Sequence, residues 1–213
     1  MADQDSPTPV DAGDSSALLS ALVTEHFVLQ SAASSTIGES GSRASIYLAA
    51  LSSGLVAIGF SSGTPSILAG LVFTIFPTIF VLGCFTVVRL VDTSIANVVA
   101  LNRIELIRGY YAEIHPLAKK FFAPDDSTGA GTLGVRYRAR SVLFTTASMV
   151  AVVNAVLGGA GLTVILSIST PLPAGVSVAV GAVVGLVVLG LGLAYQVRRF
   201  APLLRASVEP RAH

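Results

Sequence analysis

The sequence contains few of the residues on which enzymes rely. Its 213 residues include one cysteine, three histidines and no tryptophan. One cysteine excludes an intrachain disulfide, and the chain has no HExxH motif, no CxxC motif and no phosphate-binding glycine loop. Spacing singles out no set of serine, histidine and aspartate as a catalytic triad. We therefore expect a protein that is not an enzyme and that has no cofactor and no bound metal.

Charge is equally scarce. Asp, Glu, Lys and Arg make up 12% of the chain, about half the share of an average soluble domain. Hydrophobic residues make up 53%, and the formal net charge is only +1, so no basic field points to nucleic acid as a partner. A chain of this composition is expected in a lipid bilayer.

The charged residues leave two long stretches without charge, at residues 44–88 and 141–197. A proline-containing turn divides each of them. Each of the four resulting segments has about the 17 to 25 residues that a helix needs to cross roughly 30 Å of hydrocarbon. A buried hairpin of a soluble protein is the alternative for the first stretch, and the second stretch argues against it. The sequence predicts an all-α integral membrane four-helix bundle, built from two transmembrane hairpins, with N-terminal and central cytosolic helices.

The positions of the cations predict the orientation. All thirteen Lys and Arg residues lie on one side of the predicted spans, and the two turns have none. By the positive-inside rule, both termini and the central segment are cytoplasmic in a multi-pass protein of the plasma membrane. Arginines next to the spans are expected to anchor the protein at anionic head groups, with about 1 kcal/mol for each. These are Arg136, Arg138, Arg140, Arg198 and Arg199.

The same pattern divides the chain into six segments. Residues 1–13 are acidic and rich in small residues and proline, which predicts a disordered tail. The others are an amphipathic cytosolic helix (14–40), a transmembrane hairpin (44–89), a cytosolic helix and loop (90–140), a second hairpin (141–197) and a cytosolic tail (198–213).

Two of these segments predict helices outside the membrane. Residues 17–37 have a moderate apolar face, and Gly38 and Gly41 are expected to bend the chain before the first span. Residues 91–115 have a broad apolar face and are expected to continue the second span as one helix, up to Pro116. That face must be covered, either by residues 17–37 of the same chain or by the same helix of a neighbouring subunit.

Two irregular residues lie near the centres of predicted spans. Pro77 frees the backbone carbonyl of Phe73, so a kink is expected there, with Thr74 or Thr78 bonding the carbonyl. A gating hinge is the functional alternative for Pro77. Asn154 brings an amide that needs a hydrogen bond in lipid, and we expect it to lie near the kink, between the second and third spans. A pore-lining position is its functional alternative.

Small residues in the spans favour close helix packing. The fourth span carries a GxxxG pair, Gly181 and Gly185, whose partner helix is either in the same chain or in another copy. Together with the broad apolar face outside the membrane, this pair favours a homo-oligomer. Cys84 lies inside the second span and is interpreted as a small packing residue.

Part of the chain resembles known proteins. The stretches EHFVLQSAASSTIGESGSRASIYLAALSSGLVAIGF and NRIELIRGYYAEIHP resemble segments of small four-span membrane proteins of high-GC Gram-positive bacteria. Their layout of cytosolic helix, two-span hairpin and cytosolic helix is similar to that of SLATT membrane domains, which are proposed pore-forming effectors of bacterial conflict systems. The similarity covers residues 17–115 and assigns a function to no individual residue.

These observations lead to two functional hypotheses. No ionisable side chain of the Asp, Glu, Lys, Arg or His type lies inside a predicted span, which argues against a proton-coupled or ion-coupled carrier. The first hypothesis is a passive pore or permeability effector, formed by an oligomer and controlled by its cytosolic helices. The second is a structural or adaptor protein that recruits a cytosolic protein partner to the membrane.

Overall fold

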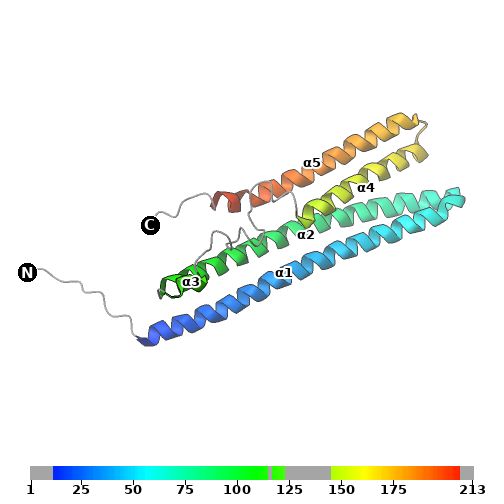
Figure 1. Cartoon of the computed structure of the whole chain (residues 1–213). Helices are drawn as coiled ribbons and strands as arrows, with labels where there is room; N and C mark the ends of the chain where they lie inside the picture. The colour runs from blue at the N-terminus through cyan, green and yellow to red at the C-terminus, as the bar shows by residue number, and fades with distance from the viewer. Residues whose placement is uncertain (1–11, 115–116, 123–144, 207–213) are drawn as a thin grey trace, which may run out of the picture.

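The computed structural model describes residues 12–114, 117–122 and 145–206, and every regular element in them is a helix (Figure 1). Four helices are long and apolar enough to cross a membrane. They are α1 (Ala12–Phe60), α2 (Pro65–Ile114), α4 (Thr146–Ser169) and α5 (Ala174–Ala206). Two short elements complete the fold, the 3-10 turn η1 (Ser61–Gly63) and α3 (Lys119–Phe122). The prediction of an all-helical chain with four candidate spans is confirmed for these residues.

Two tight turns connect the helices at one end of the molecule, here called the turn end (Figure 1). Pro65 is the first residue of α2, a position where a helix needs no backbone donor, and Leu68 donates its amide to the Thr64 carbonyl over 2.9 Å. Before α5, Pro173 accepts a hydrogen bond of 2.9 Å from the Val176 amide. The prolines that the sequence places in these turns therefore start the helices that follow.

The helices pack as two antiparallel pairs, α1 with α2 and α4 with α5, and contacts between α2 and α4 join the pairs (Figure 1). Helices α1 and α5 do not meet within the described ranges. The lengths differ between the pairs: α1 has 49 residues and α4 has 24. At about 1.5 Å per residue, α1 is roughly 74 Å long, more than twice the hydrocarbon thickness of about 30 Å. The first pair is therefore much longer than a membrane is thick, and it extends beyond α4 at the end opposite the turns, here called the charged end (Figure 1).

Helix α1 passes Gly38 and Gly41 without a break, so the predicted bend between the cytosolic helix and the first span is wrong. A glycine inside a helix costs about 1 kcal/mol relative to alanine, which tertiary packing easily offsets. Packing is present on both sides of the two glycines, through the buried residues Leu29 and Ala33 before them and Tyr47 after them. The helix predicted at 14–40 and the first span of the hairpin predicted at 44–89 are one structural element, α1.

Helix α1 of the same chain covers part of the apolar face predicted at 91–115, whereas Leu106, Tyr110 and Ile114 of that face are exposed. A small core at the charged end contains Leu29 and Ala33 of α1 with Ala100 and Ile107 of α2, each 7% exposed. Helix α2 runs unbroken from the second span to Ile114, so the predicted continuation is confirmed. The larger core lies among the four spans and contains Tyr47, Leu90, Val91, Ala147 and Phe200.

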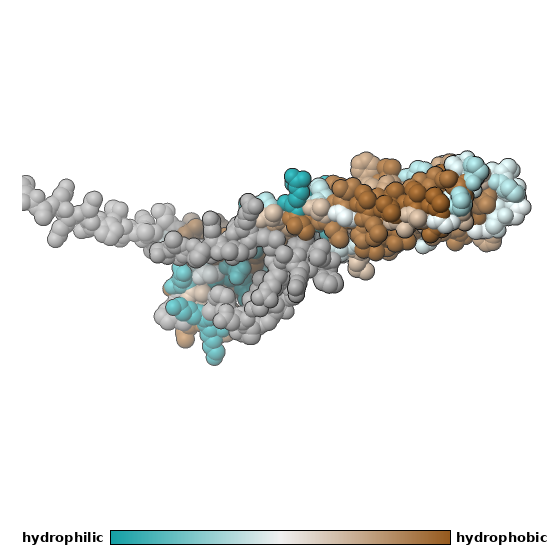
Figure 2. All heavy atoms as spheres, turned by 90° about the horizontal axis from the view of Figure 1, so that it is seen from above, coloured by the Kyte–Doolittle hydropathy of each residue, from teal (hydrophilic) through white to brown (hydrophobic). Residues whose placement is uncertain are grey.

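A regular spacing explains why α1 and α2 stay together over this length. Buried and half-buried residues of α1 recur alternately every three and four residues from Leu22 to Gly54, and those of α2 do so from Val72 to Tyr111. This 3.5-residue repeat is the pattern of a left-handed coiled coil. Figure 2 shows the hydrophobic band of the spans, which gives way to hydrophilic residues toward the charged end.

Candidate functional site

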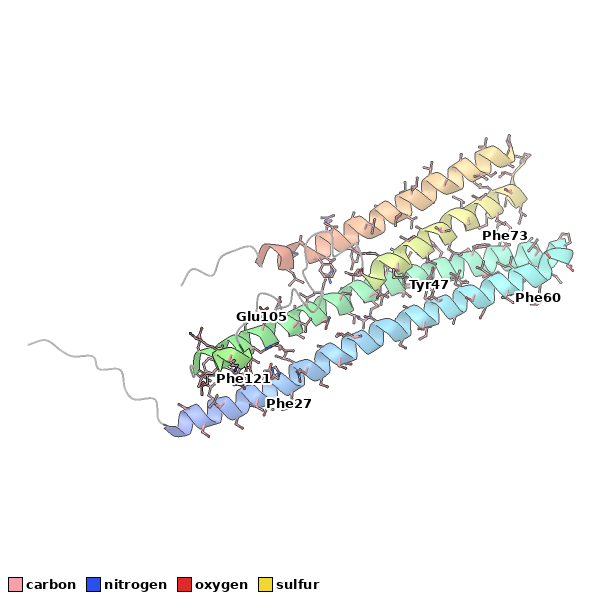
Figure 3. All side chains as sticks on the ribbon, viewed as in Figure 1. Phe27, Tyr47, Phe60, Phe73, Glu105 and Phe121 are labelled. Atoms are coloured by element: carbon pink, nitrogen blue, oxygen red, sulfur yellow. The ribbon has the colours of Figure 1, made fainter. Side chains whose placement is uncertain are left out.

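Asn154 lies at the centre of α4 with 3% of its surface exposed, at the point where α1, α2 and α4 meet. Its side-chain oxygen accepts a hydrogen bond of 3.2 Å from the Tyr47 hydroxyl, and its amide donates to the Cys84 sulfur over 3.4 Å. Gly83 provides the room, because a Cβ there would overlap the Asn154 amide and would lie 2.9 Å from the Tyr47 ring. Figure 3 shows Tyr47 at this crossing of the helices. The amide is thus bonded between helices.

Asn154 lies between the second and third spans, as predicted, but the prediction that it lies near Pro77 is wrong. Asn154 meets α2 at Gly83 and Cys84, more than one helical turn beyond Pro77. Thr74 and Thr78 do not serve the Phe73 carbonyl either, because their hydroxyls donate to the carbonyls of Gly70 and Thr74, respectively. The position of the Asn154 side chain depends on the room around it. Gly83 leaves space for the amide, and the buried Tyr47 hydroxyl donates a hydrogen bond to its oxygen.

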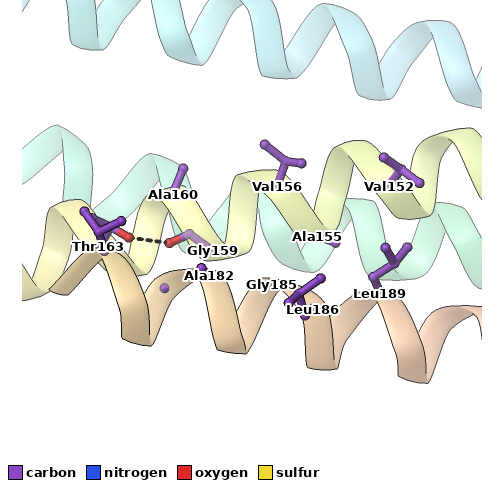
Figure 4. A pocket seen from close by; sticks show the side chains of 12 residues that line it. Val152, Ala155, Val156, Gly159, Ala160, Thr163, Ala182, Gly185, Leu186 and Leu189 are labelled. Carbon is purple, nitrogen blue, oxygen red and sulfur yellow. Dashed lines mark hydrogen bonds between the residues drawn. The ribbon is translucent and has the colours of Figure 1, made fainter. Parts of the chain in front are cut away.

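Gly181 and Gly185 of α5 face α4 of the same chain. A Cβ at Gly159 of α4 would lie 2.7 Å from the Gly181 carbonyl oxygen, and a Cβ at Gly185 would lie 3.0 Å from the Ala155 carbonyl oxygen. The two backbones are therefore in direct contact. The Thr163 hydroxyl, which donates to the Gly159 carbonyl over 3.0 Å, lies beside this contact (Figure 4). A shallow apolar groove of about 450 Å³ follows the same small residues on the surface.

Ion pairs connect the helices near the midpoints of α1 and α2. Glu39 of α1 accepts hydrogen bonds from Arg43, over 2.8 Å, and from Arg89 of α2, over 3.3 Å. The bond from Arg43 is the main cause that lowers the pKa of the Glu39 carboxyl. Arg199 of α5 donates to Asp92 of α2 over 2.6 Å, and this bond raises the pKa of Arg199.

The predicted head-group anchors therefore divide into three cases. Arg199 is held by Asp92 and is 52% exposed. Arg198 is exposed, and no ion pair joins it to another of the described side chains. The other three predicted anchors, Arg136, Arg138 and Arg140, lie outside the described residues.

Sequence reasoning missed a polar pocket of about 380 Å³ between α1, α2 and the start of α4. Its lining includes Thr36, Ser40, Thr93 and Asn97, four positions of the repeating seam between α1 and α2. A hydrogen bond between buried polar groups also joins α4 to α5, from the Ser148 hydroxyl to the Gln196 side-chain oxygen over 2.8 Å. The signal in the sequence was the polar residues at positions of the α1–α2 seam. It can be recognised only when the helix that packs against each position is known.

The described residues bring together no group of three or more His, Cys, Asp or Glu side chains that would hold a metal ion. The polar contacts between spans are made instead by hydroxyls, amides and one thiol. Such contacts hold helices together in lipid at modest strength, about 0.6 kcal/mol each on average. Comparison with protein-family models, with curated proteins and with solved structures finds no match in any of the three.

Proposed function

We propose that the protein is a four-helix bundle of two transmembrane hairpins in the plasma membrane, with both termini in the cytoplasm. The charge distribution supports this orientation, because the described Lys and Arg residues all lie on the side of the predicted spans that faces the charged end, and the two turns carry none. Reporter domains fused after Thr64 and after His213 test the topology. We expect them in opposite compartments, and finding both in the same compartment would refute it.

We further propose that the protein acts as an oligomeric pore or permeability effector that its cytosolic helices control. The observation that carries this proposal is the continuity of α1 and α2. Each helix contributes both to the small core at the charged end and to the larger core among the spans. A displacement of the cytosolic part is therefore transmitted to the first two spans through rigid helix, without a hinge at Gly38 or Gly41.

The burial of Asn154 constrains how such a pore would form. Because Asn154 is bonded to Tyr47 and Cys84 inside one chain, the lining would come from surfaces between subunits. The groove along α4 and α5 offers one such surface, with Thr163 and several small residues along it (Figure 4). Because the lining is apolar apart from Thr163, this surface would form a hydrophobic constriction, a kind of pore lining that gates by dewetting.

Ion flux in liposomes tests the proposal directly. We expect the full chain to release an encapsulated ion, and we expect Ile107→Ala, which opens a cavity in the core at the charged end, to change that rate. Leu106→Ala is the matched control, because Leu106 is 50% exposed on the same helix. Vesicles that stay sealed at high protein load would refute a pore.

An adaptor that recruits a cytosolic protein is the second candidate, and the exposed apolar side chains at the charged end favour it. Phe27 is 66% exposed, and Leu117 and Phe121 are each 71% exposed (Figure 3). Contiguous exposed apolar patches mark interaction surfaces, and Phe27 and Phe121 lie at the same end of the molecule (Figure 3). Phe27→Ser and Phe121→Ser should then abolish capture of a cytosolic partner while leaving liposome flux unchanged, and the opposite result would favour the effector.

A further inference from the structure

A crevice of about 320 Å³ separates α2 from α5 within the spans. Its walls come from residues 80–88 of α2 and 188–195 of α5, and Ala151 and Asn154 of α4 form its floor. It is distinct from the α4–α5 groove, with which it shares no lining residue. The seven-residue step from 188 to 195 corresponds to about 10 Å along α5, two thirds of the roughly 15 Å depth of one leaflet.

Charged groups lie at the end of the crevice nearest the cytosol. Val188, Leu191 and Tyr195 line it at spacings of three and four residues, and the next step along the same face of α5 is Arg198. The ion pair between Asp92 and Arg199 joins α2 to α5 just beyond the lining residues. The crevice therefore has an apolar body, and charged side chains follow it at one end.

The polar side chain in the floor does not require a polar occupant. Asn154 already accepts from Tyr47 and donates to Cys84, so its oxygen and its amide both have partners. The remaining lining is aliphatic and aromatic apart from the Tyr195 hydroxyl and Cys84. A molecule that has no hydrogen-bonding groups along the roughly 10 Å of the crevice therefore fits the site.

The other apolar occupant that a membrane offers is a helix of another subunit. A helix is about 10–12 Å across and would reach into the crevice only with its side chains, whereas a single hydrocarbon chain is thin enough to lie along it. The exposed Arg198, which forms no ion pair with the described side chains, favours a lipid with an anionic head group. We propose that the crevice binds one acyl chain of an anionic phospholipid, with the phosphate at Arg198. This inference depends on insertion of the spans in a bilayer and is independent of whether the protein forms a pore.

Photo-crosslinking tests the site in the full chain reconstituted in nanodiscs. The probe is phosphatidylglycerol with a diazirine in the middle of one acyl chain, and crosslinks are mapped by mass spectrometry. We expect crosslinks at residues 188–195 of α5, and we expect Gly192→Leu to abolish them by filling the crevice. A Cβ at Gly192 meets only the Ala151 methyl, at 3.6 Å, which is an ordinary contact. Gly190→Leu is the matched control, because nothing lies within 4 Å of a Cβ there.

The head-group part of the proposal has its own measurement. An arginine at the membrane surface contributes about 1 kcal/mol of attraction to anionic lipid, which corresponds to roughly a fivefold preference. We expect phosphatidylglycerol to compete about that much better than phosphatidylcholine for the crosslinked site. Arg198→Gln should bring the two lipids close to equal competition while leaving the positions of the crosslinks unchanged.

Several results would overturn the proposal. Equal crosslinking in Gly192→Leu and Gly190→Leu would show that the probe reports general lipid contact. An absence of lipid crosslinks at residues 188–195, with a change in oligomer mass in Gly192→Leu, would assign the crevice to another copy. Thermal unfolding in detergent identifies a variant that fails to fold, and Val188→Trp then fills the crevice from a second position. Because lipid crosslinking does not require ion flux, sealed liposomes would refute the pore and leave this site intact.

Discussion

The bond between Tyr47 and Asn154 leads to a quantitative prediction for a double-mutant cycle. Tyr47→Phe removes the donor and leaves the Asn154 oxygen without that partner, whereas Asn154→Leu leaves a fully buried phenol hydroxyl unpaired. An unpaired buried polar group costs about 1–3 kcal/mol. The double variant leaves neither group, so it should be less destabilised than the sum of the two changes. Interhelical bonds in membrane proteins predict a coupling of about 0.6–1.7 kcal/mol.

The assay is the free energy of unfolding in mixed micelles, titrated with a denaturing detergent for the four proteins of the cycle. Additivity within about 0.3 kcal/mol would refute the bond as a source of stability. Pro77→Ala combined with Asn154→Leu is the control cycle, because Asn154 contacts α2 at Gly83 and Cys84. We expect that pair to be additive. Coupling to Pro77 in the absence of coupling to Tyr47 would restore the hypothesis from the sequence.

Gly83→Ala tests whether the Asn154 site requires the room that the missing side chain at Gly83 leaves. The added Cβ overlaps the Asn154 amide, so we expect a loss of about 1–3 kcal/mol of unfolding free energy. In an Asn154→Ala background the loss should be smaller, because the overlapping group is gone and only the Tyr47 ring remains close. Gly70→Ala, where a Cβ meets nothing within 4 Å, is the matched control on α2. Equal losses at the two glycines would contradict the packing described here.

Three further predictions concern other contacts. Ile107→Ala should lower the unfolding free energy by about 2–5 kcal/mol and Leu106→Ala by much less, because only Ile107 is buried in the core at the charged end. Gly159→Ala should weaken the α4–α5 contact by about 1–3 kcal/mol, since the new methyl meets a carbonyl oxygen at 2.7 Å, whereas Gly190→Ala should be neutral or stabilising in the same unfolding assay. The lowered pKa of Glu39 means that its contribution to stability is present above its ordinary pKa of 4.5 and is lost as the pH falls through the lowered value. Thermal unfolding from neutral to acidic pH should therefore depend less on pH in Glu39→Gln than in the parent, and an identical pH profile would contradict this reasoning.

The seam between α1 and α2 also bears on how a cytosolic signal would reach the membrane. Its residues are apolar at Leu29 and Ile107 and again at Tyr47 and Leu90, but they are small or polar between these levels. A seam of this kind is weakest between these levels, because hydroxyls there replace the aliphatic side chains that hold a coiled coil together. Rearrangement of the helix pair would begin at this level.

Composition and charge alone determined the number of candidate spans and the all-helical class. A charge-free run is a local property, and lipid requires every backbone group within it to be bonded inside a helix, so length and hydropathy are sufficient. The unbroken α2 was also readable, because the apolar spacing of residues 91–115 continues from the span. The positions of Lys and Arg add a predicted orientation by the same local reasoning.

Tertiary structure decided what each irregular residue does. Gly38 and Gly41 have the sequence signature of a bend, yet packing on both sides of them keeps α1 straight through the boundary. The need of Asn154 for a partner was evident, but its partners are 107 and 70 residues away, at Tyr47 and Cys84. Helix approach selects those partners, because the missing side chain at Gly83 lets three helices meet there, and no local pattern in the sequence encodes that meeting.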